Sequence, residues 1–185
     1  MFRVILSAIG LAVLFFTGVF AYFGAFNTIT VTESDIGPFT LVYQSNVGDY
    51  KQTGSTVDYM MKISLSMGAT PIAGFGQYYD DPSTVALEKL RSDAGIVIDP
   101  KDLGKFQNYA HNLKSEHKIL TREFPLTRAV TSEFPLRGIL STFLGIIKAY
   151  PVMDQYMKSK NYPMTYAFEI YPLNEKKVQY AFPLK

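Results

Sequence analysis

IAGFGQYYDDP (residues 72–82) and YAFEIYPL (residues 166–173) decide the fold, because the second stretch repeats the pattern of the first. Each contains Phe-x-x-Tyr, each soon reaches a proline, and each follows a segment whose apolar residues recur at helical spacing. The repetition predicts the same strand in two copies of one structural unit.

Strand alternation places an acid among aromatic rings in the second copy. Side chains alternate across a strand, so Glu169 and Tyr171 share one face, where the first copy has Gly76 and Tyr78. The carboxylate would then lie opposite a position without a side chain. The pattern favours a pocket over a solid core at this place.

The composition fits one ordinary folded domain, since 185 residues leave about 150 after the N-terminal segment. The 18 basic and 16 acidic residues are interspersed and the net charge is only +2, so no basic stripe indicates nucleic-acid binding. Without cysteine, a disulfide framework, a catalytic thiol and a thiolate metal site are excluded. His111 and His117 have no third ligand at metal spacing, so neither a metal site nor another cofactor is predicted.

Residues 4–26 form an apolar run without a charge, where about 20 residues suffice to cross a bilayer. We expect a single-pass transmembrane anchor at residues 1–26, followed by a juxtamembrane linker or first edge strand at residues 27–38. A cleaved signal peptide is the alternative, because the run contains a Val-x-Ala cleavage pattern. Arg3 precedes the run and the first charges after it are acidic, which predicts a cytoplasmic N-terminus and an extracytoplasmic domain.

Residues 39–185 are expected to form the folded domain, and each half reads strand, helix, strand, strand. Pro125 separates two strands that can pair with each other, and Pro151 is expected to break or kink the last helix. Asp80 and Asp81 are interpreted as a helix cap more than as an acid pair. Strands are predicted at 39–46, 72–79, 94–98, 118–124, 127–133, 165–171 and 178–183, and helices at 50–67, 83–90, 103–113 and 136–157.

The order of these elements resembles that of the GyrI-like small-molecule-binding domain family, a family of bacterial effector-binding domains. The motifs that carry the resemblance are VGDYKQTG (47–54), YYDDP (78–82), LRSDAGIVI (90–98) and FEIYPL (168–173), and the resemblance extends over about residues 39–184. The apolar N-terminal run and the segment EFPLRGIL...YPVMDQYMK (133–158) are similar, more narrowly, to the membrane-anchored testis-expressed reticulophagy receptors of animals.

The resemblance implies an α+β fold of two pseudo-symmetric β-α-β-β units, which form a curved antiparallel sheet with helices on one side and a cleft near the pseudo-twofold axis. Family members typically bind small, often cationic and hydrophobic molecules there, and Glu169 matches their late-strand glutamate by position. A poorly solvated carboxylate favours a cation, and tyrosine faces add a cation–π attraction of roughly 0.5 to 2 kcal/mol. The predicted ligand-binding residues are Glu169, Tyr171, Tyr78, Tyr43, Tyr50 and Phe75.

Three functions stay open at this stage. The first is a membrane-anchored module that binds a small amphiphilic or cationic molecule, unless Glu169 is merely solvated or paired with a lysine. The second is an adaptor that binds a protein partner, although we expect no C-terminal tail of the kind the resembled receptors use. The third is a hydrolase of electrophilic small molecules, with Glu169 as general base and Tyr171 polarising the substrate. An enzyme is the least favoured, because the sequence offers no further catalytic constellation.

Overall fold

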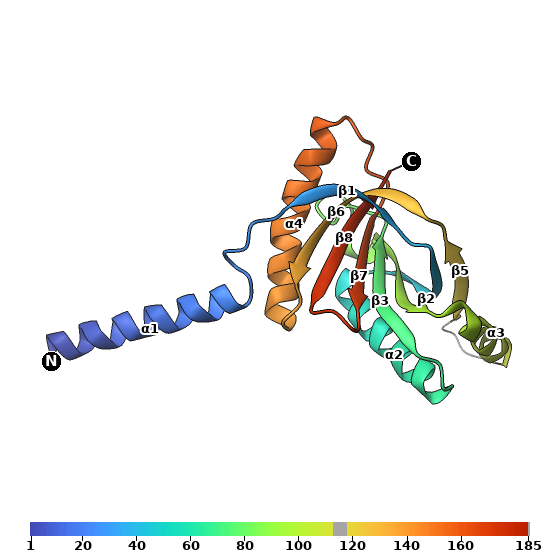
Figure 1. The fold of residues 1–185 in the computed structure, drawn as a ribbon, viewed down its shortest axis with the longest axis horizontal. Helices are drawn as coiled ribbons and strands as arrows, with labels where there is room; N and C mark the ends of the chain where they lie inside the picture. Colours follow the sequence, from blue (N-terminus) through green and yellow to red (C-terminus); the bar gives the residue numbers. More distant parts are fainter. Residues whose placement is uncertain (113–117, 185) are drawn as a thin grey trace.

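The chain consists of an apolar N-terminal helix and an α+β domain, in a computed structural model that describes residues 1–112 and 118–184, with the backbone alone for 108–112. Figure 1 shows the N-terminal helix projecting away from the sheet. The described helices are α1 Phe2–Tyr22, α2 Thr53–Ser66, α3 Leu103–Asn112 and α4 Ile139–Ser159. The strands are β1 Val31–Ile36, β2 Phe39–Val47, β3 Pro71–Tyr78, β4 Arg91–Ile98, β5 Leu120–Phe124, β6 Thr127–Pro135, β7 Ala167–Pro172 and β8 Lys177–Pro183.

Two β-α-β-β units build the sheet, as the repeated aromatic strands predict. The units are β2-α2-β3-β4 and β6-α4-β7-β8, and the strand order is β1-β6-β8-β7-β3-β4-β2-β5. The neighbouring strands are antiparallel throughout. The order is preserved when the two units are exchanged, so a pseudo-twofold axis passes between β3 and β7, the two aromatic strands.

Each edge strand pairs with the unit that does not directly follow it in the sequence. β1 precedes the first unit but pairs with β6, whereas β5 precedes the second unit but pairs with β2. The predicted pairing of the strands around Pro125 is therefore wrong, because Pro125 and Leu126 carry the chain across the sheet instead of forming a hairpin. Residues 31–36 adopt the edge-strand alternative for the juxtamembrane segment.

The two crossing connections touch each other. Gly37 has φ +82°, and a Cβ at Gly37 would lie only 2.9 Å from the carbonyl oxygen of Pro125. The left-handed backbone and the close approach both require glycine at this position. This contact brings the β1–β2 and β5–β6 connections together across the curved sheet (Figure 1).

Apolar side chains fill both faces of the sheet. On the face that carries α2 and α4, Met60 packs with Ile96 of β4, and Met153 packs with Val130 of β6. The other face carries a core of Leu41, Ala73, Phe75, Val97, Phe124, Phe168 and Ile170, among others. The ring centroids of Phe124 and Phe168 are 4.8 Å apart although their strands are four positions apart in the sheet, which requires the sheet to curve.

Two local predictions need correction. Asp81 accepts a hydrogen bond from the Ser83 amide at 2.8 Å, as a cap would, but only a short 3₁₀ turn at Leu87–Lys89 follows instead of a helix over 83–90. Pro151 does not break α4, which runs continuously from Ile139 to Ser159. The helix tolerates Pro151 because its packing on β6 and β8 outweighs one missing backbone hydrogen bond.

Candidate functional site

A buried carboxylate lies beside the pseudo-twofold axis on the helix-bearing face. Glu169 of β7 is 3% exposed and stands opposite Gly76 of β3, the register that strand alternation predicts. Tyr150 of α4 donates a hydrogen bond to Glu169 Oε1 at 2.6 Å, and Tyr171 donates one to Oε2 at 2.5 Å. Both carboxylate oxygens are therefore held by phenol groups.

The space over Gly76 is filled by the side chain of Tyr78. A Cβ at Gly76 would lie 2.5 Å from the Tyr78 hydroxyl oxygen, so that side chain folds back over the glycine. Its ring packs edge-on against Tyr50 at 4.8 Å between centroids, and its hydroxyl lies 3.3 Å from Thr53 Oγ1. The pocket that the sequence pattern favours is thus closed here by tyrosine rings. Glycine is needed at position 76 to admit one of them.

The charge of Glu169 is not balanced by a cation. Within residues 1–107 and 118–184, no lysine or arginine forms an ion pair with its carboxylate. Burial raises the pKa of Glu169, while the hydrogen bonds from Tyr150, Tyr171 and Tyr78 lower it. Burial, followed by the charge of Glu169, raises the pKa of each of these three tyrosines well above the ordinary value. The cluster therefore combines a desolvated acid with three neutral phenols.

A further hydroxyl in the cluster lacks a partner. Tyr180 of β8 stands opposite Glu169 on the side away from β3, and burial raises its pKa. Its hydroxyl is buried and makes no hydrogen bond within the described part of the chain. It lies against Gly145 of α4, where a Cβ would collide with it. Such a buried, unsatisfied hydroxyl is uncommon in folded proteins.

We call Glu169, Tyr78, Tyr150, Tyr171 and Tyr180 the tyrosine–glutamate cluster. Of the residues predicted from sequence, Glu169, Tyr78 and Tyr171 meet in it, and Tyr50 supports it through the ring of Tyr78. Tyr150 in the apolar stripe of α4 and Tyr180 in the last strand were missed, because no sequence pattern brings these segments next to Glu169. The available signal was a tyrosine within an otherwise apolar helix stripe and a tyrosine in the last strand.

Tyr43 and Phe75 lie on the opposite face of the sheet and do not contact the cluster. Phe75 stacks on Phe168 at 5.4 Å between centroids, and the guanidinium of Arg122 lies 4.9 Å from the centroid of the Tyr43 ring. Strand alternation places Phe75 and Tyr78 on opposite faces of the sheet, as it does Phe168 and Tyr171. Their assignment to the ligand site is not supported by their placement.

The opposite face has its own buried acid, which is fully partnered. Asp93 accepts hydrogen bonds from Ser45 at 2.7 Å and from Tyr79 at 2.6 Å, and its carboxylate pairs with Arg122 at 3.4 Å. Burial, together with the hydrogen bond to Asp93, raises the pKa of Tyr79 to about 12. Arg122 also donates to Gln77, so this network ties the edge strand β5 to β3 and β4.

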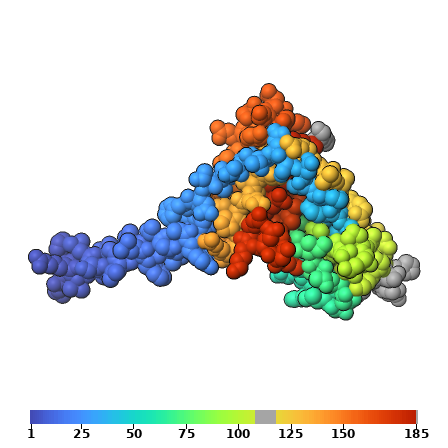
Figure 2. Space-filling model, viewed as in Figure 1, coloured from blue at the N-terminus to red at the C-terminus, as the bar shows by residue number. Residues whose placement is uncertain are grey.

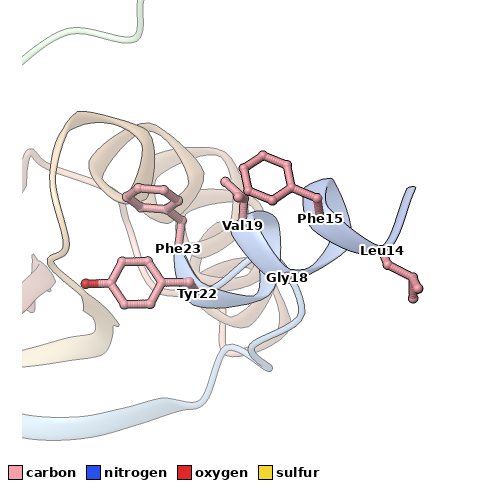
Figure 3. A pocket seen from close by; sticks show the side chains of 6 residues that line it. All are labelled: Leu14, Phe15, Gly18, Val19, Tyr22 and Phe23. Atoms are coloured by element: carbon pink, nitrogen blue, oxygen red, sulfur yellow. The ribbon is translucent and has the colours of Figure 1, made fainter. Parts of the chain in front are cut away.

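The N-terminal helix is relevant to the localisation of the protein. α1 has 21 residues and none is buried, so by length and composition it is a candidate membrane span, as a signal sequence would also be. Figure 3 shows a shallow apolar hollow along it, lined by Leu14, Phe15, Gly18, Val19, Tyr22 and Phe23.

The side chain of His111 and the whole of His117 lie outside the described residues, and the rest of the described chain holds no group of three metal-ligating side chains.

No family model matches the sequence. The chain is 27% identical over 166 residues to the testis-expressed protein 264 homolog of Mus musculus, a match that covers 88% of this chain and 51% of that protein. It is 26% identical over 153 residues to the human testis-expressed protein 264, with 78% and 44% covered. The chain thus spans about half the length of these relatives.

Solved structures share the fold at low sequence identity. EcmrR in its complex with DNA superimposes with a TM-score of 0.61 at 14% identity, over 98% of this chain and 65% of that one. The isolated EcmrR C-terminal domain gives a TM-score of 0.57 at 14% identity, over 85% and 98%. A conserved protein of Listeria innocua gives 0.53 at 12% identity, over 84% and 92%. The domain therefore shares the α+β fold of the EcmrR C-terminal domain.

Proposed function

We propose that this protein is a membrane-anchored binding module that takes up a small cationic or amphiphilic molecule at the tyrosine–glutamate cluster. The observation that carries the proposal is Glu169, a carboxylate that is 3% exposed and has no cationic partner within the described residues. Desolvating a carboxylate without a counter-charge is costly, and a protein that needed only core packing would be better served by a neutral residue. A bound cation would supply the missing charge.

The phenol rings around Glu169 suit such a ligand. Tyr78 and Tyr171 are only partly buried and adjoin the carboxylate, so rotation of these side chains would open a path to Glu169. Tyr78 is held by an edge-on ring contact with Tyr50, by a hydrogen bond of 3.3 Å with Thr53 and by its hydrogen bond to Glu169, and rotation of its side chain would have to break all three. Once displaced, the ring faces would contact a cation, and the free hydroxyl of Tyr180 would offer a hydrogen-bond donor.

The fold and the N-terminal helix support the remaining parts of the proposal. The fold is shared with the EcmrR C-terminal domain, and the resemblance to GyrI-like domains implies that Glu169 takes the position of their late-strand glutamate. α1 is long and apolar enough to hold the domain at a membrane. We place the domain on the extracytoplasmic side, because the only charge before the apolar run is Arg3 and the first charges after it are acidic.

The test is to titrate the full chain in lipid nanodiscs with tetraphenylphosphonium, with tetraphenylborate as a control of the same shape and opposite charge. Glu169→Gln should weaken binding of the cation by about tenfold or more, which corresponds to the loss of roughly one charge-assisted contact. Tyr43→Phe, on the opposite face, should leave it unchanged. Because the chain has no tryptophan, its emission comes from its 13 tyrosines, and the comparison with Glu169→Gln separates the contribution of the cluster.

Partitioning of the ions into lipid is measured with nanodiscs that contain no protein and is subtracted from the total. Binding should also weaken as the pH falls through the raised pKa of Glu169, since protonation removes the charge that attracts the ligand. Equal affinity in the wild type and in Glu169→Gln at neutral pH would overturn the assignment of this site.

A further inference from the structure

The outward face of the first half of α4 is apolar and uncovered. Ile139, Phe143 and Ile147 recur every four residues and are 91%, 61% and 52% exposed. The helix buries its other face, at Ser141, Gly145, Ala149, Met153 and Met157. No charged residue lies between Arg137 and Lys148. We call the exposed residues Ile139, Phe143, Ile146 and Ile147 the α4 ridge.

The two basic residues that bracket the ridge hold the end of α1. Arg137 donates a hydrogen bond to the carbonyl oxygen of Tyr22, and its guanidinium lies 5.0 Å from the centroid of the Tyr22 ring. Lys148 donates to the carbonyl oxygen of Ala25 and lies 3.5 Å from that of Gly24. Cations at a helix C-terminus satisfy its free carbonyl groups and complement its dipole.

Apolar packing fixes the same junction. A Cβ at Gly24 would lie 2.9 Å from the ring of Phe134, and one at Gly138 would lie 4.0 Å from the ring of Phe23. Gly138 is the residue immediately before α4, so α4 starts where α1 ends. Figures 1 and 2 show α1 leading away from the domain beside α4.

We propose that the α4 ridge lies in the lipid surface of the membrane that α1 crosses, an inference that rests on the anchoring proposed above. A helix that leaves the bilayer near Tyr22 places the first turns of α4 at headgroup level. Apolar side chains of a surface-lying helix enter the acyl boundary, to a depth of about 5–10 Å. Tyr22 then takes an interfacial position typical of tyrosine, and Arg137 and Lys148 reach the phosphate groups.

The change of character along α4 favours lipid as the occupant. The outward positions beyond Pro151 include Gln155, Lys158 and Lys160, which are exposed and polar. Four of the five exposed large hydrophobic residues of α4 lie in the half adjoining α1, the fifth being Val152, and that half continues the surface of an already apolar, unburied helix. Basic residues at both ends of the ridge complement anionic lipid headgroups. If the ridge instead bound a second copy of the chain, there would be no reason for the apolar half of α4 to lie next to the end of α1.

The absence of cysteine permits single-cysteine labelling at any position. Three variants of the full chain, Phe143→Cys, Leu65→Cys and Ala12→Cys, would carry a nitrobenzoxadiazole fluorophore in vesicles of phosphatidylcholine and phosphatidylserine. Leu65 is the matched control, an apolar residue of α2 that is 67% exposed. Ala12 reports whether α1 is inserted. Quenching is measured with lipids that carry a nitroxide on the acyl chain.

We expect strong quenching at positions 12 and 143 and quenching weaker by about twofold or more at position 65. Quenching at position 12 alone would overturn the docking of α4 and leave the anchor intact. No quenching at position 12 would overturn both the docking of α4 and the membrane anchor. If the fluorescence at position 143 instead follows the protein-to-lipid ratio without quenching, the ridge joins two copies and the proposal is wrong. Binding of tetraphenylphosphonium is measured separately, so the two proposals fail independently.

Discussion

At the scale of single residues, two opposing influences set the pKa of Glu169. Burial raises it by disfavouring the charged carboxylate, and the hydrogen bonds from Tyr150 and Tyr171 lower it by stabilising that charge. Burial has the larger effect, so the folded protein binds a proton at Glu169 more tightly than the unfolded chain does. Glu33 is the contrasting case, since a hydrogen bond from Tyr156 holds its pKa below the ordinary value.

We predict that Glu169 makes the stability of the protein fall as the pH rises. The unfolded carboxyl titrates near the ordinary value of 4.5 and the folded one above it. Between these two values the folded state holds the extra proton, so the free energy of unfolding decreases with rising pH and then levels off. Thermal melts of the wild type and Glu169→Gln over pH 4 to 8 should diverge in this direction, in favour of the variant at high pH.

The exposed carboxylate of Glu175 provides the control, because Glu175→Gln should follow the wild type in parallel. Tyr171→Phe removes one hydrogen bond that lowers the pKa of Glu169, so it should move the divergence to higher pH. A constant difference between the wild type and Glu169→Gln at all pH values would contradict the raised pKa.

At the scale of elements, glycine decides how closely α4 approaches the sheet. A Cβ at Gly145 would collide with the Tyr180 hydroxyl and would lie 3.0 Å from the ring of Phe134. Gly54 of α2 has no atom within 4 Å of the corresponding position. The same substitution in the two helices therefore tests packing apart from helix propensity.

Gly145→Ala should destabilise the protein by about 1–3 kcal/mol, because overpacking outweighs the propensity gain of up to about 1 kcal/mol. Gly54→Ala should be neutral or stabilising by a few tenths of a kcal/mol to about 1 kcal/mol. Denaturant unfolding followed by tyrosine fluorescence measures both. A stabilising Gly145→Ala would show that α4 does not press on β8 as described.

The elements also mark the limit of local sequence patterns. The alternation around Glu169 and Gly76 gave the correct register, because burial on one face specifies a strand to within one residue. The pairing partners of β5 and β6 could not be obtained in this way. The backbone hydrogen bonds of an apolar edge strand can be made equally well in a local hairpin or with a distant strand of the sheet. Packing of the core around Phe124 and Phe168 decides between these two pairings.

At the scale of the whole molecule, two cations join the N-terminal helix α1 to the domain. Arg137 and Lys148 come from a segment more than a hundred residues away in the chain from Tyr22 and Ala25, and they tie the domain to α1 in one orientation. Surface ion contacts are usually weak, but these two act on one junction together with the packing of Gly24 on Phe134.

Removing both cations should loosen this orientation. Spin labels at Ala12→Cys and Lys62→Cys report the position of α2 relative to α1 in detergent micelles, where no bilayer supports the domain. The variant Arg137→Gln with Lys148→Gln should broaden the distance distribution. Lys158→Gln with Lys160→Gln removes the same charge from the far end of α4 and should not. Equal widths in both variants would mean that packing alone fixes the junction.

The sequence by itself determined the two repeated units, the register of β3 against β7 and the apolar N-terminal helix. These features follow from patterns a few residues long, namely strand alternation, helical spacing and an uninterrupted apolar run. It also placed Glu169 beside Tyr171 and opposite Gly76.

Tertiary structure alone decided what surrounds that acid. Whether Tyr78 lies over Gly76 or in solvent depends on its contacts with Tyr50 and Thr53, and whether Tyr150 reaches the acid depends on how α4 packs on the sheet. The face of Phe75 follows from alternation along β3, but that of Tyr43 depends on how β2 and β3 both pair with β4. The closed state of the cluster is a property of side chains distant in sequence, which no local pattern encodes.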